Sequence, residues 1–311
     1  MKKKYAIGID IGGSHISSVL VEIQSGQIVR KSYSESKLDN QASAEEIFQI
    51  WGNTIQETIN HAELSEIEGL GFAMPGPFDY ENGIALFKGV AKYDNLYGLN
   101  VKKELNKVLN LSNDMPFRYI NDAMSFAIGE AWSGPAAKYN KVVAVTLGTG
   151  FGSAFIKDGV PVIEGNNVPP MGYVYNIPYE NGIADDYFST RWFINEYEIR
   201  SGKKCKGVKE IAEQAAIEQT ANELFVDFGR RLGRFLEPLL NQFDAQCLVI
   251  GGNISKAYGL FGPLFQKELN NASVKVEVVI SELMEDAAMT GSARLMDSRF
   301  WAETQQIVSK I

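Results

Sequence analysis

The sequence has little cysteine and little histidine. Among its 311 residues, only Cys205, Cys247, His15 and His61 are of these two types. Cys205 lies among lysines, whereas Cys247 lies in an apolar stretch typical of a buried strand, so a disulfide framework is not expected. Neither cysteine has a partner at metal-ligand spacing, and we therefore expect no zinc site.

Long apolar runs and a basic surface are missing as well. No apolar stretch approaches the roughly 20 residues that a membrane-spanning helix needs. The apolar segment Tyr5–Ile11 is too short for a signal peptide and contains Asp10. The net charge of -8 argues against nucleic acid or an anionic membrane surface as a partner. We expect a cytoplasmic protein of ordinary globular composition.

The chain has no Walker A loop, but it has two similar glycine turns. The apolar segment 7–11 runs into Gly12-Gly13-Ser14, and the segment 142–147 runs into Gly148-Thr149-Gly150. A second apolar stretch follows each turn, so a strand, turn, strand pattern occurs twice. The backbone N–H groups of two such turns can bind a polyphosphate.

Each turn has a second interpretation. The first can be an ordinary hairpin whose glycines supply positive φ, or a phosphate loop in which Asp10 organises Mg²⁺ and its waters. The second superficially resembles a dinucleotide-binding motif. A strand is expected after Gly148–Gly152 where that motif requires a helix, and the third glycine is missing. A nicotinamide enzyme is therefore not expected, and a second phosphate hairpin is favoured.

Helical and extended patterns alternate along the rest of the chain, which predicts an α/β fold with two similar halves on either side of a cleft. We expect an N-terminal domain at residues 1–120, with a C-terminal helix at about 297–311 packed on it, and a C-terminal domain at 121–296. Expected strands cover residues 4–11, 16–23, 27–34, 69–74, 117–120, 141–163, 246–250 and 274–280. Expected helices cover 43–62, 98–109, 121–132, 184–200, 207–216, 218–241 and the residues after about 286.

Polar or glycine residues follow several of these strands. Asn121-Asp122 comes directly after the strand at 117–120 and can simply cap the next helix. The carboxyl ends of such strands are also where α/β sheets bind ligands, and Asp122 there can accept a proton from a hydroxyl group. Gly251-Gly252 follows another strand and can let a nucleotide base or ribose approach the backbone. Pro75-Gly76 begins a turn.

Taken in order, these segments resemble the ROK family (repressors, open reading frames and sugar kinases), part of the actin-like ATPase superfamily. The resemblance rests on Ile9–Ser14, Gly71–Asp79, Asn121–Ala123, Leu147–Gly150 and Val249–Gly252. It implies two actin-like ATPase (ribonuclease H-like) domains around an interdomain cleft. It also implies phosphorylation of a sugar hydroxyl by ATP and Mg²⁺, and a homodimer.

The resemblance also assigns roles to single residues. It implies that Asp122 is the general base, that Asn121 binds the sugar, and that Asp10 serves Mg²⁺ through water. Phosphate binding falls to Gly12, Gly13, Ser14, Gly148, Thr149 and Gly150, and the adenosine border falls to Gly251 and Gly252. Substrate contacts fall to Pro75, Gly76, Asn121, Asp122, Tyr173 and Asp185.

The sequence departs from the family pattern on the sugar side. Pro170 and Tyr173 stand where the family has a sugar-binding Glu and His, no cysteine cluster follows, and Asp185 is the best match to the Glu that ends that cluster. Lys92 and Asn95 both fit the place of a sugar-contacting Asn. We therefore expect a zinc-free kinase for a sugar or sugar derivative other than an ordinary glucokinase. The alternative is a catalytically impaired protein that binds sugar or nucleotide and acts by interaction.

Overall fold

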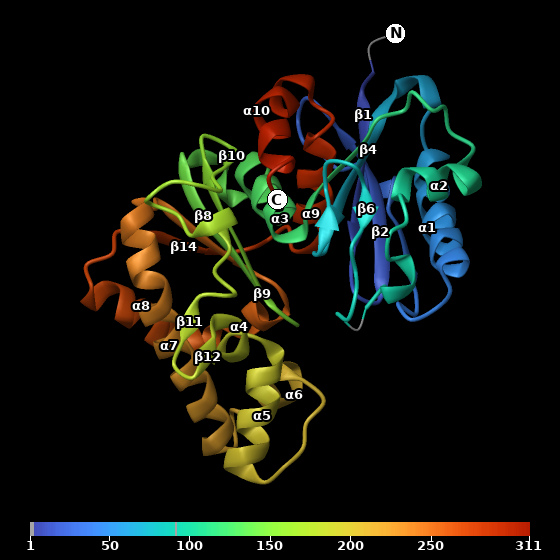
Figure 1. The fold of residues 1–311 in the computed structure, drawn as a ribbon. Coiled ribbons are helices and arrows are strands. Elements are labelled where there is room, and N and C mark those ends of the chain that lie inside the picture. Colours follow the sequence, from blue (N-terminus) through green and yellow to red (C-terminus); the bar gives the residue numbers. More distant parts are fainter. Residues whose placement is uncertain (1–2, 91) are drawn as a thin grey trace. The chain divides into compact units, whose positions relative to one another are not determined.

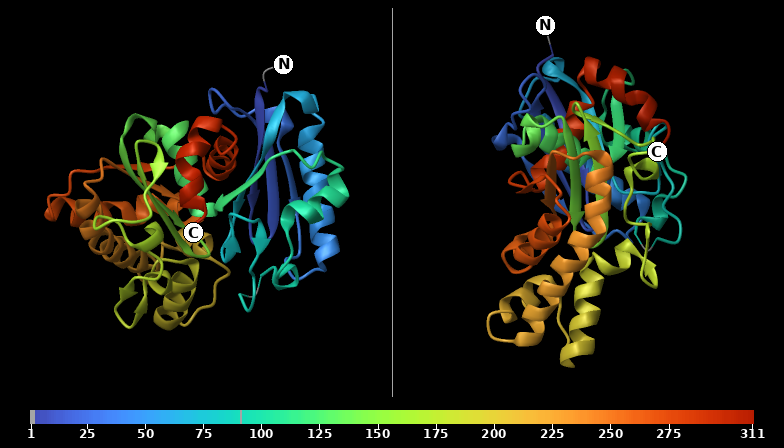
Figure 2. Two further views of the ribbon diagram at one scale, coloured as in Figure 1. Left: turned by 45° about the horizontal axis from the view of Figure 1, so that its top comes forward. Right: turned by 90° about the vertical axis from the view of Figure 1, so that its left-hand side faces the viewer.

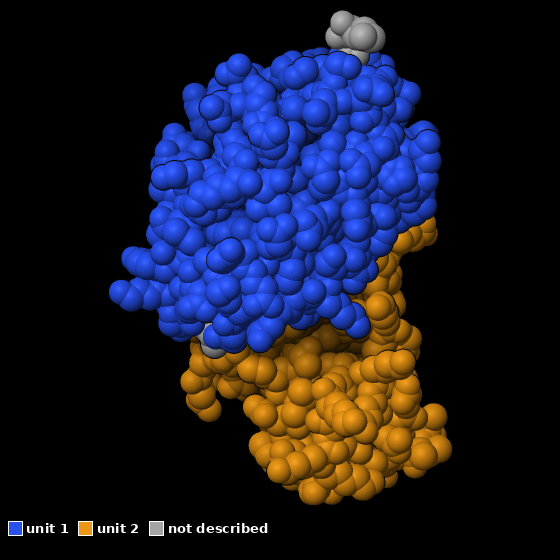
Figure 3. Space-filling model, turned by 90° about the vertical axis from the view of Figure 1, so that its right-hand side faces the viewer, with its two compact units in different colours: residues 1–137, 159–161, 285–311 blue, residues 138–158, 162–284 orange. Residues whose placement is uncertain are grey.

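The computed structural model describes residues 3–90 and 92–311, which form two compact units, each built on one β-sheet (Figures 1 and 3). Unit 1 comprises residues 1–137, 159–161 and 285–311, and unit 2 comprises residues 138–158 and 162–284. Both sheets mix parallel and antiparallel strands and pack against helices. This architecture confirms the predicted α/β class.

The sheet of unit 1 brings the carboxyl ends of three strands to one edge. Its strand order is β3-β2-β1-β4-β7; β1 pairs antiparallel with β2 and parallel with β4, and β4 pairs parallel with β7. Asp10 lies opposite Ala73, and Met74 lies opposite Asn121. Chemical groups far apart in the sequence therefore meet at this edge. The strands are β1 (Tyr5–Ile11), β2 (His15–Glu22), β3 (Ser34–Lys37), β4 (Ile67–Met74) and β7 (Phe117–Asn121).

The third strand differs from the prediction for residues 27–34. Residues Arg30–Ser32 form a 3₁₀ turn, and β3 begins only at Ser34. The Ser32 hydroxyl accepts a hydrogen bond from the Leu20 amide (2.9 Å) and donates one to the Val29 carbonyl (2.7 Å). Because this side chain takes the place of a backbone ladder partner, the chain turns where a strand was expected.

Helices cover both faces of the unit 1 sheet. In Figure 2, α1 and α2 lie side by side on one face and α9 lies on the other. Glycines permit this packing on the α9 side: a Cβ atom on Gly8 would lie 1.9 Å from the Met289 carbonyl oxygen, and one on Gly291 would lie 1.8 Å from that of Ser125 in α3. The helices are α1 (Ala44–Ile59), α2 (Val101–Leu109), α3 (Asp122–Trp132), α9 (Glu285–Arg294) and α10 (Ser298–Val308).

The units therefore divide the chain differently from the predicted boundary at residue 120. Both α3 and α9 belong to unit 1, because their backbones meet at Gly129 and Gly291 without intervening side chains. The terminal helix α10 belongs to unit 1 as well.

Unit 2 repeats the arrangement of parallel strand ends. Within it the strand order is β9-β8-β13-β14; β8 pairs antiparallel with β9 and parallel with β13. Thr146 lies opposite Gly251, so the glycine residues after β8 and β13 are neighbours. The strands are β8 (Lys141–Leu147), β9 (Phe151–Lys157), β13 (Cys247–Gly251) and β14 (Glu277–Ile280).

The helices of unit 2 surround an aromatic core. The long helix α7 confirms the helix expected at 218–241, and its apolar face buries Leu224, Phe225, Phe228, Leu232 and Phe235. The helix expected at 184–200 is two helices, because Phe188 turns into the core and the Thr190 amide bonds to the Gly148 carbonyl. The helices are α4 (Ala184–Tyr187), α5 (Thr190–Ser201), α6 (Val208–Gln214), α7 (Gln219–Phe243) and α8 (Tyr258–Asn271).

Two segments outside the expected strands and helices contain short paired strands. In unit 1, β5 (Phe78–Asp79) pairs with β6 (Ile84–Ala85), and in unit 2, β11 (Pro178–Tyr179) pairs with β12 (Gly182–Ile183). The remaining short strand is β10 (Val160–Pro161). Over residues 3–90 and 92–311, no helix is both long enough and apolar enough to cross a membrane.

Candidate active site

The first turn, Gly12-Gly13-Ser14, joins β1 to β2 and leaves open space beside its backbone. Neither glycine has left-handed backbone, so positive φ does not explain them. A Cβ on Gly12 would lie 2.4 Å from the His15 ring, whereas one on Gly13 would meet no atom within 4 Å. A side chain at position 12 would therefore displace the His15 ring, and Gly13 keeps the surface of the turn accessible.

Every carbonyl of the first turn is held by another segment. The Tyr93 hydroxyl donates to the Gly12 oxygen (2.6 Å), the Asn40 amide donates to the Gly13 oxygen, and the Leu38 N–H donates to the Ser14 oxygen (3.0 Å). Within the described residues, the N–H groups of Gly13 and Ser14 donate to no protein acceptor. The turn thus keeps free the donors that an anion needs.

Asp10 precedes this turn and lies among other acids. Burial, together with the charges of Asp122 and Glu285, raises its pKa from an ordinary 3.8 to about 7. A cation at this position would relieve the repulsion. Among the residues that the structure describes, no cluster of three or more Asp, Glu, His or Cys side chains is arranged to hold a metal ion. One carboxylate with waters and substrate phosphates is, however, the usual setting of Mg²⁺, so Asp10 fits that ion.

Asn121 and Asp122 divide two tasks at the end of β7. Asn121, not Asp122, caps α3: its side-chain oxygen accepts from the N–H groups of Ala123 (3.1 Å) and Met124 (3.3 Å). Its amide donates to Asp122 Oδ1 (3.0 Å), which also accepts from the Ala123 N–H (2.8 Å). Asp122 Oδ2 accepts no hydrogen bond from the described residues. One carboxylate oxygen is therefore held and the other is available.

Opposing effects act on the Asp122 carboxyl group. Although the residue as a whole is exposed, burial of its carboxyl group raises the pKa, and the charge of Lys92 and the N–H donors of Ala123 and Asn121 lower it. The N-terminus of α3 also favours the ionised form. Burial is the largest of these effects, so the pKa of Asp122 lies above its ordinary value, and a more basic carboxylate suits a proton acceptor.

The structure separates the two candidates for the sugar-contacting position. Asn95 donates to the carbonyl oxygens of Gln41 (3.0 Å) and Ala42 (2.9 Å), so its amide supports the chain. Lys92 acts electrostatically on Asp122. Lys92 is therefore the better candidate for a substrate contact.

Pro75 and Gly76 follow β4 directly, beside the strand that carries Asn121. Pro75 is buried, Gly76 is exposed, and the Gly76–Pro77 peptide bond is cis. The Tyr80 hydroxyl donates to the Met74 carbonyl (3.2 Å) and so holds the end of β4. The predicted substrate residues 75 and 76 thus lie at the same sheet edge as Asp122.

The second turn, Gly148-Thr149-Gly150, joins β8 to β9 in unit 2. The Gly148 oxygen accepts from the N–H (2.8 Å) and the hydroxyl (2.9 Å) of Thr190, the first residue of α5. A Cβ on Gly148 would meet no atom within 4 Å, and Thr149 and Gly150 are exposed. Like the first turn, this one is held at a carbonyl and open at its surface.

Asp185 supports the second turn through the residue that follows it, Phe151. Its Oδ1 accepts from the Phe151 N–H (2.7 Å), and its Oδ2 pairs with the Arg191 guanidinium (2.6 Å). Both oxygens are therefore engaged inside unit 2, which differs from the substrate contact predicted for this residue. Tyr173, the other predicted substrate residue here, is partly exposed and packs at 5.7 Å from the Tyr175 ring.

Gly252 places the end of β13 against the end of β8. Its φ is +80°, and a Cβ there would lie 2.4 Å from the Leu147 carbonyl oxygen. Only glycine permits this approach. Gly251 and Gly252 thus lie next to the second turn, and the adenosine border assigned to them stays a prediction.

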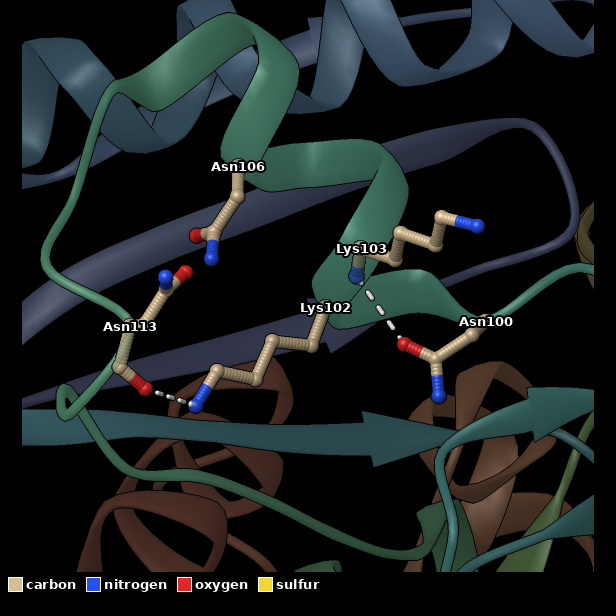
Figure 4. A pocket seen from close by; sticks show the side chains of 5 residues that line it. All are labelled: Asn100, Lys102, Lys103, Asn106 and Asn113. Atoms are coloured by element: carbon tan, nitrogen blue, oxygen red, sulfur yellow. Dashed lines mark hydrogen bonds between the residues drawn. The ribbon is translucent and has the colours of Figure 1, made fainter.

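A polar hollow of about 290 Å³ lies elsewhere on unit 1, along α2 (Figure 4). In it Lys102 Nζ donates to the Asn113 carbonyl (2.8 Å) and the Met115 carbonyl (2.9 Å), which secures the loop after α2. None of its lining residues belongs to the predicted site, and we assign it a structural role.

Glu285, Tyr93, Asn40, Thr190 and Arg191 contribute to the site but were missed by sequence reasoning. Arg191 pairs with Asp185, six positions away, but the other four act on residues that are distant along the chain; Tyr93 and Gly12, for example, are 81 positions apart. Only Glu285 gave a local signal, an acid in the first turn of a helix.

The model of the ROK family matches residues 6–299. The chain belongs to the ROK family. This ROK chain is 28% identical to the glucokinase of Thermotoga maritima, covering 96% of this chain and 99% of that one. It is 27% identical to the N-acetyl-D-glucosamine kinase of Haemophilus influenzae, covering 80% and 84%.

A solved structure shows the same fold. The ROK family glucokinase from Streptomyces griseus, in complex with glucose and AMPPNP, superposes with a TM-score of 0.73 at 21% identity, covering 94% of this ROK chain and 98% of that chain. The fold is therefore the actin-like ATPase fold of ROK sugar kinases, as the resemblance implied.

Proposed function

We propose that this chain phosphorylates a hydroxyl group of a sugar or sugar derivative with ATP, and that Asp122 is the general base. The observation that carries the proposal is the divided carboxylate: Oδ1 is held by Asn121 and Ala123, and Oδ2 is available. The two related enzymes named above, both sugar kinases, support the reaction class.

Asp122 would receive the proton of the attacking hydroxyl at Oδ2. Phosphoryl transfer depends mainly on positioning and on charge neutralisation, with a base that orients the nucleophile. Asn121 and the start of α3 fix the direction of this carboxylate, and the charge of Lys92 favours its ionised form against the effect of burial. Unit 1 therefore offers the acceptor side of the reaction.

The phosphates of ATP would lie against Gly12, Gly13 and Ser14 in unit 1 and against Gly148, Thr149 and Gly150 in unit 2. The N–H groups of Gly12 and Gly148 donate within the turns, to the carbonyls of His15 (3.0 Å) and Gly150 (3.1 Å), so the other N–H groups of the turns would bind the phosphates. Gly251 and Gly252 would border the adenosine. Asp10 would hold Mg²⁺ through water, and the ion, when bound, would neutralise phosphate charge.

The substrate would differ from glucose. The resemblance assigns substrate contacts to Pro75, Gly76, Asn121, Asp122, Tyr173 and Asp185. Of these, Asn121 and Asp185 already use their side-chain polar atoms in hydrogen bonds within the protein. Tyr173 and Pro170 lack the charge of the family's His and Glu. A site that lacks a hydroxyl partner rejects the sugar that needs it, so a different hydroxyl pattern or a derivative is favoured.

A panel of hexoses, N-acetylhexosamines and other sugars tests the proposal by ADP release with Mg²⁺. We expect turnover on at least one sugar and a loss of about 1,000-fold in kcat for Asp122→Asn. Asp158→Asn removes a carboxylate from a turn outside the site and should leave kcat unchanged. If Asp122→Asn retains wild-type turnover, Asp122 is not the base.

The second candidate is a catalytically impaired protein that binds sugar or nucleotide. The replacement of charged sugar partners by Pro170 and Tyr173 favours it. Tight binding of ATP together with no turnover of any sugar would replace the kinase proposal with this one.

A further inference from the structure

Tyr93 is held in an unusual conformation under the first turn. It is fully buried, and its backbone is left-handed with φ of 60°. Its ring packs at 5.6 Å from Trp51 and at 5.6 Å from Phe87. A non-glycine residue in this region costs roughly 1 kcal/mol or more and persists where its surroundings fix it. The anchored ring delivers the hydroxyl to the Gly12 oxygen at 2.6 Å.

Asn40 links Tyr93 to the same turn by a second route. The Tyr93 N–H donates to the Asn40 carbonyl (3.0 Å), and the Asn40 side-chain amide donates to the Gly13 oxygen. Asn95 joins the two segments again through the carbonyl oxygens of Gln41 and Ala42. We call residues 38–42 and 93–95 the turn support.

The turn support fixes the direction of the two free N–H groups. In a trans peptide the C=O of one residue and the N–H of the next lie in one plane and point in opposite directions. Holding the Gly12 oxygen therefore aims the Gly13 N–H, and holding the Gly13 oxygen aims the Ser14 N–H. Both donors point away from the turn support, toward the open side of the turn.

We infer that Tyr93 is a positioning residue for nucleotide phosphates: its hydroxyl, together with Asn40, pre-orients the Gly13 and Ser14 N–H groups for the phosphate chain of ATP. The inference rests on the proposed function, because it requires that this turn binds phosphate. Pre-oriented donors bind an anion more tightly, since less order must be created on binding.

Isothermal titration with AMPPNP and with adenosine, both in the presence of Mg²⁺, tests the inference on the full chain. We expect Tyr93→Phe, which removes only the hydroxyl, to weaken AMPPNP binding about 10-fold and to leave adenosine binding unchanged. Asn40→Ala should show the same selective loss. The matched control is Tyr119→Phe, which removes another buried hydroxyl of unit 1, from a ring packed on Phe72 and Phe78.

Two results would overturn the inference. The first is wild-type AMPPNP affinity in folded Tyr93→Phe, or in Asn40→Ala if Tyr93→Phe does not fold. The second is an equal loss of AMPPNP and adenosine affinity, which would indicate a general structural role. A wild-type chain that binds no AMPPNP would instead refute the proposed function, and this inference with it.

Discussion

The two glycine turns have the same backbone plan but different supports. The carbonyls of the first are held by Tyr93 and Asn40, which lie outside helices and strands. In the second turn, the Gly148 carbonyl is held by Thr190, the first residue of α5. The Phe151 N–H that follows the turn donates to Asp185, which lies in the short helix α4. In both, the glycine that meets no neighbour leaves the surface open. The shared requirement is thus a held carbonyl face and an accessible N–H face, not left-handed glycine.

The two turns differ most in charge. Asp10 stands two residues before the first turn, and the matching residue before the second turn is Thr146. The first turn therefore lies next to a carboxylate that repels phosphate unless a cation is present. The second lies next to a neutral hydroxyl, and the Asp185 carboxylate that contacts it is paired with Arg191. From this difference we expect the first turn, and not the second, to depend on Mg²⁺.

Among substitutions that distinguish the two turns, Asp10→Asn is expected to have the largest effect on kcat. Without the carboxylate that would hold Mg²⁺, kcat should fall about 1,000-fold, whereas Thr146→Val should change it little. ADP release at saturating Mg²⁺ measures both. Equal losses in the two variants would contradict the assignment of the metal to the first turn.

The same substitution should change how the free energy of unfolding depends on pH. The folded pKa of Asp10, about 7, exceeds its ordinary 3.8, so the protonated form stabilises the fold, and this contribution is lost as the pH rises from about 4 to above 7. Asp10→Asn should therefore be more stable than wild type at pH 8 without Mg²⁺, by about 4 kcal/mol, and equal to it near pH 4. Urea unfolding at both pH values measures this difference.

A smaller effect is expected from filling the open side of a turn. Gly13→Ala places a methyl group where the free chain has no neighbour, so the urea midpoint should stay at the wild-type value while AMPPNP binding weakens about 100-fold. The control is Gly8→Ala, whose methyl group would meet the Met289 carbonyl at 1.9 Å and should destabilise the fold by about 1–3 kcal/mol. Unchanged AMPPNP affinity in Gly13→Ala would rule out phosphate binding at this turn.

The smallest effect is expected for Asp185→Asn. If Asp185 supports the second turn, AMPPNP affinity should fall about 10-fold and the KM for the sugar should stay constant. The surface pair Arg234–Glu268 offers a control in Glu268→Gln. A raised KM for the sugar with unchanged AMPPNP affinity would indicate that Asp185 contacts the substrate and does not support the second turn.

Residues at strand ends were predictable, because the local pattern that defines a strand also defines where it stops. Asp10, Asn121, Asp122 and Gly251 were found in this way. The third strand of unit 1 was misplaced because a single hydroxyl, that of Ser32, replaced a ladder bond. Such a side-chain substitution leaves no periodic trace in the sequence.

The supports of the turns were not predictable, since each joins segments that are distant along the chain. Nothing local distinguishes Tyr93 from the other tyrosines, and Lys92 could not be separated from Asn95 before the bonds of Asn95 were known. The sequence therefore indicated the backbone of the site and the candidate base, but not what orients them.

Lys92 and Tyr93 are adjacent, and this adjacency limits how the protein can evolve. Lys92 acts on the carboxylate proposed to receive the sugar proton, and Tyr93 holds the turn proposed to bind phosphate. An insertion or deletion between residues 88 and 95 that suited a new sugar would also displace the tyrosine. New substrate preferences should therefore arise by side-chain replacement at position 92, with the length of this segment kept constant.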